Sequence, residues 1–245
     1  MKKSDRQNAL AVAAVALCFM LTLGLCYFLG GEGFLLAFNQ SEGGVKCYLL
    51  CGGSYENVTL ARNAAELAKS RGGAGYVIVG DVSEVVLAAY ASYDDAQTVL
   101  DGGSAGTGAY IKEVTVGEIP VDWAPKNMRE AAESALGYYD VVFDCLYETA
   151  NGIAADSLTV ADARTRVAVC RARVEEMRSD FSDASAGSDD ARCTELKLAL
   201  VTALALIDNV ALSDMYGSAA AVSSLRYQCV QLVLCREALY GVLAG

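Results

Sequence analysis

Two acidic side chains in the second half of the chain have a spacing that could serve acid–base chemistry. Asp140 and Asp144 lie four residues apart on one expected helix, and Glu175 and Glu176 lie close to Asp180 on another. Two carboxylates can act as general acid and general base when their surroundings hold their pKa values apart. Solvated helix faces carry the same pattern, and no nucleophile motif accompanies it here. The sequence therefore predicts that the protein is not an enzyme.

A second stretch that could bind a charged group is Gly52-Gly53-Ser54, which follows an apolar segment and precedes an expected helix. Backbone amides at the start of a helix can hold a phosphate. The chain contains neither Gly-x-Gly-x-x-Gly nor Gly-Lys-Ser/Thr, the two patterns typical of nucleotide sites. We therefore interpret the glycines as a packing turn between strand and helix, and the glycine-rich segment 101–108 as a mobile loop.

The residue types also restrict metal and cofactor chemistry. The chain has no histidine, the most common general base and metal ligand. Its nine cysteines include no Cys-x-x-Cys pair, the usual spacing of a thiolate zinc site. We predict no metal site and no cofactor. The cysteines fall where a small hydrophobic residue would fit, which favours buried free thiols and leaves one or two disulfides open.

The charge balance restricts the partners. The chain has 30 Asp plus Glu and 19 Lys plus Arg, with a formal net charge of -11. Three of the basic residues, Lys2, Lys3 and Arg6, lie in the amino-terminal tail. An acidic chain repels polyanions, so we expect no nucleic-acid partner.

Residues 9–30 contain no charged side chain and match the roughly 20 residues that a helix needs to cross a bilayer. Basic residues precede this segment and Glu32 follows it. The positive-inside rule then places the tail, residues 1–8, in the cytoplasm and the bulk of the chain outside. A cleaved signal peptide shares the basic start but usually ends in a small-residue exit, which is missing here. We therefore predict a single-pass protein of the cell membrane with a retained anchor.

A linker, residues 31–45, leads to a compact module over residues 46–116. Apolar alternation, helical periodicity and glycine punctuation define its elements. The expected order is strand 46–51, helix 56–70, strands 76–79 and 84–89, helix 94–100 and strand 110–116. This order of strand, helix, strand, strand, helix and strand predicts a ferredoxin-like βαββαβ module.

Pro120, Trp123 and Pro125 mark a boundary, and beyond it the apolar pattern is helical. Four apolar stripes follow over residues 128–146, 160–181, 193–210 and 222–239. Amphipathic helices joined by short connections pack as an antiparallel bundle. The predicted fold class is thus α+β: a transmembrane helix, the βαββαβ module, and a four-helix bundle over residues 125–245.

Two segments of the module resemble the repeats of a SPOR domain, the sporulation-related repeat of bacterial envelope proteins. Residues 50–55, Leu-Cys-Gly-Gly-Ser-Tyr, are similar to the motif that ends the first strand of that family, and residues 85–96 to the motif around the third strand. The matching positions are Gly53, Ser54, Tyr55, Tyr90, Ser92, Asp94, Asp95 and Ala96. The resemblance covers the module only, residues 46–116.

The resemblance implies that the module binds cell-wall glycan strands stripped of their peptides, in division or sporulation. Aromatic rings and a hydroxyl at strand ends suit sugars. The candidate glycan-binding residues are Tyr48, Ser54, Tyr55, Tyr90 and Tyr93.

Strand alternation defines a second candidate surface, on the face of the sheet opposite the two helices. It assigns Cys47, Leu49, Cys51, Glu84, Val86 and Ala88 to that open face. Two polar strand residues of the SPOR family correspond here to Cys51 and Val86. A sheet with two apolar faces needs a layer on each side. The apolar members therefore form a candidate docking face, for the chain's own bundle or for a partner protein.

Two functions are compatible with these features. One is an envelope protein whose SPOR-like module binds peptidoglycan glycan or has become a docking domain. The other is a scaffold or interaction protein of a membrane complex in sporulation or division, with no glycan binding. The expected partners are glycan strands or an envelope protein, with membrane contact through residues 9–30.

Overall fold

The computed structural model describes residues 46–212 and 217–243, all of which belong to one compact unit, Ser41–Gly245. The predicted tail, membrane segment and linker (residues 1–8, 9–30 and 31–45) lie outside the described residues. None of the described helices is long and apolar enough to cross a membrane. Within the described part, a four-stranded antiparallel sheet is combined with helices, which confirms the α+β class.

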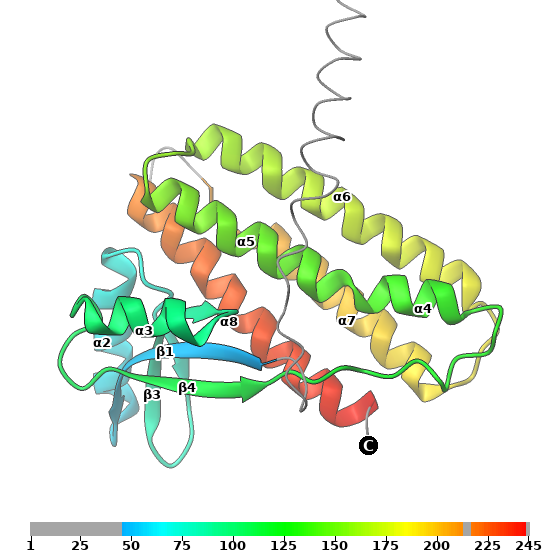
Figure 1. Cartoon of the computed structure of the whole chain (residues 1–245), viewed down its shortest axis with the longest axis horizontal. Coiled ribbons are helices and arrows are strands. Elements are labelled where there is room, and N and C mark those ends of the chain that lie inside the picture. The colour runs from blue at the N-terminus through cyan, green and yellow to red at the C-terminus, as the bar shows by residue number, and fades with distance from the viewer. Residues whose placement is uncertain (1–45, 213–216, 244–245) are drawn as a thin grey trace, which may run out of the picture. The chain divides into compact units, whose positions relative to one another are not determined.

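The first half of the described chain forms the sheet and two helices (Figure 1). Its elements are β1 (Lys46–Tyr55), α2 (Val58–Ser70), β2 (Tyr76–Ile78), β3 (Ser83–Tyr90), α3 (Tyr93–Asp101) and β4 (Tyr110–Thr115). The strand order is β2-β3-β1-β4, and each neighbouring pair is antiparallel. The predicted sequence of strands and helices is therefore present in the order expected.

Local chemistry explains where the two helices of the module begin. The side chain of Asn57 accepts a hydrogen bond from the Thr59 amide at 2.8 Å and so caps α2. Ser92 accepts from the Asp95 amide at the start of α3. Such caps satisfy amides that have no partner within the helix.

The pairing of β1 with β3 has two register shifts, which interrupt the regular alternation of side chains between the two faces of the sheet. Leu50 pairs with Ala88 and Cys51 pairs with Val86, so β3 has one extra residue, Leu87, at that point. A second shift lies between Cys51 and Gly53 of β1. The expectation that a glycine turn follows residue 51 is therefore wrong, because β1 continues through both glycines to Tyr55. A side chain at Gly52 would approach Leu87 to 3.1 Å, so the bulge is closely packed.

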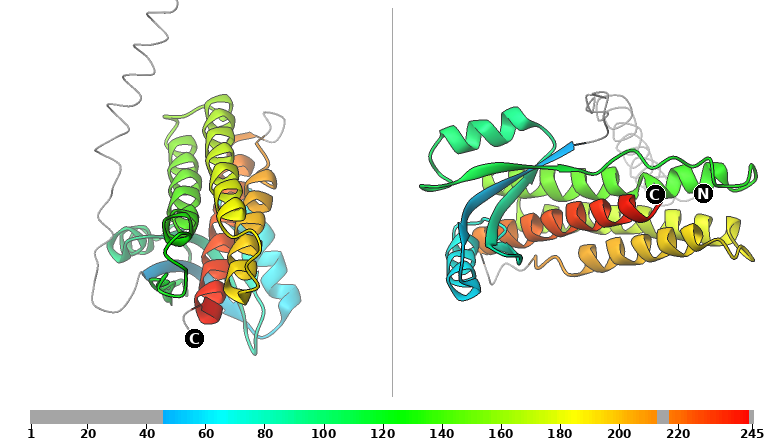
Figure 2. Two further views of the ribbon diagram at one scale, coloured as in Figure 1. Left: turned by 90° about the vertical axis from the view of Figure 1, so that its right-hand side faces the viewer. Right: turned by 90° about the horizontal axis from the view of Figure 1, so that it is seen from below.

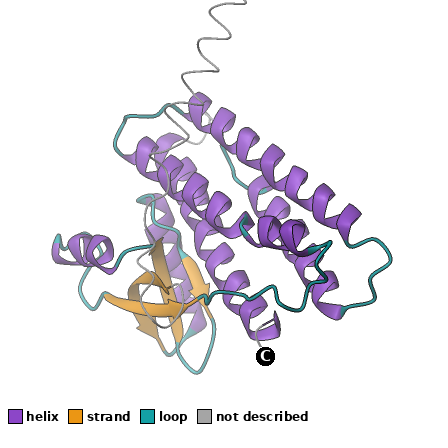
Figure 3. Ribbon diagram, turned by 45° about the vertical axis from the view of Figure 1, so that its right-hand side comes forward, coloured by secondary structure: helices purple, strands orange, loops and turns teal. Residues whose placement is uncertain are grey.

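The second half of the described chain is helical (Figures 2 and 3). Its elements are α4 (Arg129–Leu136), α5 (Tyr138–Ala154), α6 (Val160–Ala184), α7 (Ala191–Asp208) and α8 (Gly217–Leu243). Helices α5 and α7 each pack against both α6 and α8, and from α5 to α8 each helix runs opposite to the one before it. The first predicted helix is split at Gly137 into α4 and α5, a break that its apolar periodicity did not reveal.

Helix α8 joins the two halves. It contacts α5 and α7 in the bundle, and it also contacts β2, β3, β4 and α2 of the module. Figure 1 shows α8 passing beside the sheet along much of its length. One continuous hydrophobic core therefore runs from one face of the sheet into the bundle.

Gly117, directly after β4, lies in close contact with the end of α8. Its φ is +55°, and a Cβ added there would lie 2.0 Å from Cε2 of Tyr240. Gly103 has a similar φ of +69° but open space around it. Both alanine variants carry backbone strain, and only Gly117→Ala must also displace Tyr240.

We expect Gly117→Ala to lower the free energy of unfolding by about 2 kcal/mol more than Gly103→Ala. Urea unfolding of the two variants beside the unchanged chain measures the difference. Equal losses would show that the β4–α8 contact adjusts without cost.

Candidate functional site

The predicted docking face is occupied by the protein's own bundle. Cys47, Leu49, Cys51 and Val86 are buried, with 1% or less of each exposed, in the core that includes α5 and α8. Their neighbours in that core include Tyr139 of α5 and Leu225 and Cys229 of α8. The cover over this face is therefore a layer of helix side chains from the same chain.

Ala88 does not belong to this face. It packs with Leu50, Tyr90 and Ala96 in a separate cluster on the side of α3. The extra residue in β3, Leu87, reverses the alternation between Val86 and Ala88. The sequence assignment of Ala88 to the docking face is therefore wrong, and Ala89 takes its place in the shared core.

The thiols on the covered face behave as small hydrophobic groups. The Cys47 thiol donates to the carbonyl oxygen of Tyr90 at 3.2 Å, and burial raises its pKa to about 12. Burial is also the main reason why the pKa of Cys51 is raised to about 11. All seven cysteines of the described ranges are free. Protonated thiols in an apolar setting pack against methyl groups and offer little to a sugar.

The covered face ends at a polar cluster on the sheet. Glu84 accepts hydrogen bonds from Lys112 Nζ and from the Tyr110 hydroxyl. Partial burial acts to raise the pKa of Glu84, but the bonds from Lys112 and Tyr110 outweigh it and lower that pKa. The carboxylate is thus already satisfied within the sheet.

The five candidate glycan-binding residues do not form one surface. Tyr48 and Tyr93 make an edge-to-face pair with ring centroids 5.6 Å apart, and Tyr93 is 49% exposed. Tyr90 is buried against Tyr147 of α5 at 6.0 Å. Ser54 is exposed near the end of β1, and Tyr55 faces α2. Of the five, only Tyr48 and Tyr93 form a ring contact with each other.

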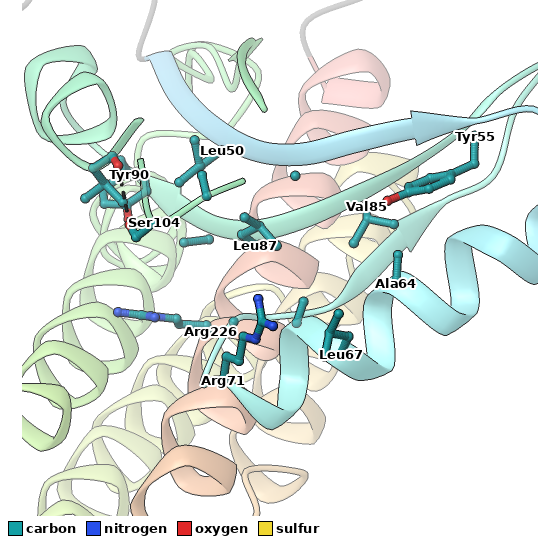
Figure 4. A pocket seen from close by; sticks show the side chains of 16 residues that line it. Leu50, Tyr55, Ala64, Leu67, Arg71, Val85, Leu87, Tyr90, Ser104 and Arg226 are labelled. Atoms are coloured by element: carbon teal, nitrogen blue, oxygen red, sulfur yellow. Dashed lines mark hydrogen bonds between the residues drawn. The ribbon is translucent and has the colours of Figure 1, made fainter. Parts of the chain in front are cut away.

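Tyr55 and Tyr90 both line a pocket of about 290 Å³ on the helix side of the sheet. Figure 4 shows Leu50, Val85 and Leu87 reaching into it from the sheet, with α2 along one side. Tyr55 lies at one end and Tyr90 with Ser104 at the other. The pocket therefore has an aliphatic floor and aromatic ends.

Two arginines complete the pocket. Arg71 follows the last turn of α2, and Arg226 comes from α8. Arg226 Nη1 donates to the carbonyl oxygen of Gly72 at 3.0 Å, a bond that links α8 to the turn after α2. Sequence reasoning missed both arginines, because Arg226 lies 155 residues from Arg71 and no local pattern connects them.

The charges around this pocket are unlike those of the whole chain. Its lining contains Arg71 and Arg226 and no Asp or Glu, in a protein of net charge -11. Among the described residues, neither arginine forms a salt bridge. Burial raises the pKa of the Tyr90 hydroxyl, and the charge of Arg226 acts in the opposite direction.

The paired carboxylates of α5 lie elsewhere. Burial, aided by the charges of Asp140 and Glu148, raises the pKa of Asp144 to about 6. Burial also raises the pKa of Asp140, and Arg236 opposes that shift. Over residues 46–212 and 217–243, no group of three or more acidic or cysteine side chains could hold a metal ion. The absence of enzymatic activity stays a prediction.

Comparisons with known proteins give no relative. No family model, no curated protein and no solved structure matches the chain. The functional interpretation therefore rests on the residues and their geometry.

Val86 tests how tightly the bundle covers the sheet. It is fully buried under the bundle, whereas Val79, after β2, is 67% exposed. Asparagine at position 86 would place an amide without partners in the shared core. We expect Val86→Asn to lower the free energy of unfolding by about 3 kcal/mol, and Val79→Asn to change it by less than about 0.5 kcal/mol. Similar values in a denaturant titration would show that the face is open.

Asp144 gives a pH dependence with a defined sign. Its folded pKa, about 6, lies above the ordinary value of 3.8, so the folded state holds the proton more tightly. The resulting stabilisation is complete below about pH 4 and is lost as the pH rises through 6. The Asp144 side chain is partly exposed to solvent, so we expect an effect of about 1 kcal/mol.

Asp144→Asn should therefore gain stability relative to the unchanged chain between pH 4 and pH 7. Thermal unfolding across that range is the measurement. Asp180→Asn, which removes an exposed carboxylate from α6, is the matched control. A constant difference between Asp144→Asn and the unchanged chain would contradict the raised pKa.

Proposed function

We propose that the protein is a single-pass envelope protein in which a SPOR-like module packs against a helical scaffold. In this proposal the docking face of the sheet does not bind glycan. The order of elements and the β2-β3-β1-β4 sheet support the ferredoxin-like resemblance. The burial of Cys47, Leu49, Cys51 and Val86 by the bundle carries the proposal.

Glycan binding on that face would require α8 to leave it. On α8, the core side chains include Leu225, Cys229 and Leu232, each at most 2% exposed. Exposing such side chains costs about 1.5–3 kcal/mol each. The face released in this way would offer methyl groups and protonated thiols. A sugar needs hydroxyl partners and a ring for stacking, so nothing offsets the cost.

The outer surface of the bundle supports a scaffolding role. Leu198 and Val201 of α7 are 57% and 50% exposed and lie on one side of that helix, and Val169 of α6 is also exposed. Neighbouring apolar side chains at helical spacing suit the apolar face of a partner helix. The SPOR resemblance implies that this surface joins a membrane complex of cell division or sporulation.

Peptidoglycan binding tests the proposal. The full chain in detergent is mixed with insoluble sacculi, before and after an amidase removes the stem peptides, and the pellet is assayed. A SPOR domain with an uncovered sheet is the positive control. We expect the control to pellet with peptide-stripped sacculi and the present protein to stay in solution.

Enrichment of this protein on peptide-stripped sacculi alone would overturn the proposal. The exposed Tyr93 and Ser54 would then be substituted by alanine to locate the glycan contact. Loss of pelleting in those variants would restore the glycan-binding function that the SPOR resemblance implies.

A further inference from the structure

We propose that the pocket between α2, α3 and the sheet binds a small amphiphile with an aliphatic body and one anionic head group. This pocket lies on the opposite side of the sheet from the docking face, and it shares with the function proposed above only the seating of α8 on the module. It rests on the shape, the apolar floor and the two arginines of the pocket.

The aliphatic body follows from the side chains that line the floor. Leu50, Val85, Leu87 and Val99 come from the sheet and α3, and Leu67 comes from α2. At about 290 Å³, the cavity is at the small end of ligand sites. Its apolar floor offers no donors for the several hydroxyls of a sugar ring. A short alkyl chain fits this surface better than a glycan does.

The anionic head follows from the arginines. Each guanidinium has five N–H donors. Within the described part of the chain, the two side chains together make one hydrogen bond, from Arg226 to the carbonyl oxygen of Gly72. No carboxylate lines the pocket to neutralise them. Carboxylate and phosphate oxygens match the planar fork of a guanidinium. An anion beside Arg71 and Arg226 would supply the missing acceptors.

The pocket is also built from both halves of the protein. Arg71 belongs to the module, whereas Arg226 comes from α8 at the edge of the pocket (Figure 4). A ligand that contacts both arginines would therefore bind only when α8 is seated on the module. Binding and the seating of α8 are then coupled, so that each favours the other.

Photo-crosslinking in the intact protein tests the site. The full chain is placed in phosphatidylcholine nanodiscs and irradiated with octanoate that carries a diazirine on its alkyl chain, and adducts are located by mass spectrometry. We expect adducts within residues 64–71 and 85–90. Octanoate should suppress labelling at least ten-fold better than octanol, which lacks the charge. Octyl phosphate in a parallel competition shows whether the head is of carboxylate or phosphate type.

Three variants link the labelling to the arginines. A hydrogen bond to a charged group contributes about 1.5–3 kcal/mol, which corresponds to about a ten-fold to hundred-fold weaker half-saturation. We expect that loss for Arg226→Gln and for Arg71→Gln. Arg62→Gln, on the exposed side of α2, should label as the unchanged chain does. Arg71 is itself exposed, so its variant keeps the test valid if Arg226→Gln fails to fold.

Several outcomes would overturn the proposal. Adducts spread over the surface, or equal labelling of Arg62→Gln and Arg71→Gln, would show that the pocket does not select the probe. Octanol competing as well as octanoate would show that charge plays no part. N-acetylmuramic acid competing better than octanoate would assign the pocket to a sugar acid instead.

Discussion

A four-stranded sheet with two apolar faces needs a layer on each side, and this requirement governs the described fold. Helices α2 and α3 cover one face, and α8 with α5 covers the other. The bundle is therefore part of the module's own core. Because Cys47, Leu49, Cys51 and Val86 are more apolar than a sugar-binding strand face would be, the face needs a permanent cover.

With one face covered by the bundle, the pocket of the sheet lies on the opposite side. The gap between α2 and α3 exposes part of the sheet, and α8 contributes Arg226 to its edge. The same helix thus closes one surface and completes another. The tyrosines that sequence similarity grouped together are distributed over these surfaces, because Tyr90 is packed against α5 while Tyr93 faces solvent.

Periodicity predicted most of the elements, because apolar alternation and helical stripes depend on local sequence. The order of strands and helices and the helical second half were predicted in this way. The side of the sheet on which Ala88 lies was not predicted. A one-residue bulge at Leu87 reverses the alternation, and no sequence pattern indicates that bulge. Nor was the presence of Arg71 and Arg226 in one pocket predicted, because it depends on the return of α8 to the module. Long-range contacts of this kind have no local pattern.

The packing of α8 against the sheet also constrains the order in which the fold can form. Strand β1 is synthesised before the bundle, yet its apolar face is buried in the same core as α8, Gly217–Leu243, the last of the described helices. About 100 residues separate the end of β4 from the start of α8, and they must be synthesised before that face can be buried. Contacts between residues so far apart in sequence form slowly. A nascent chain stalled before α8 would present Leu49 and Val86 to solvent. Burial of this sheet face therefore depends on the synthesis of α8.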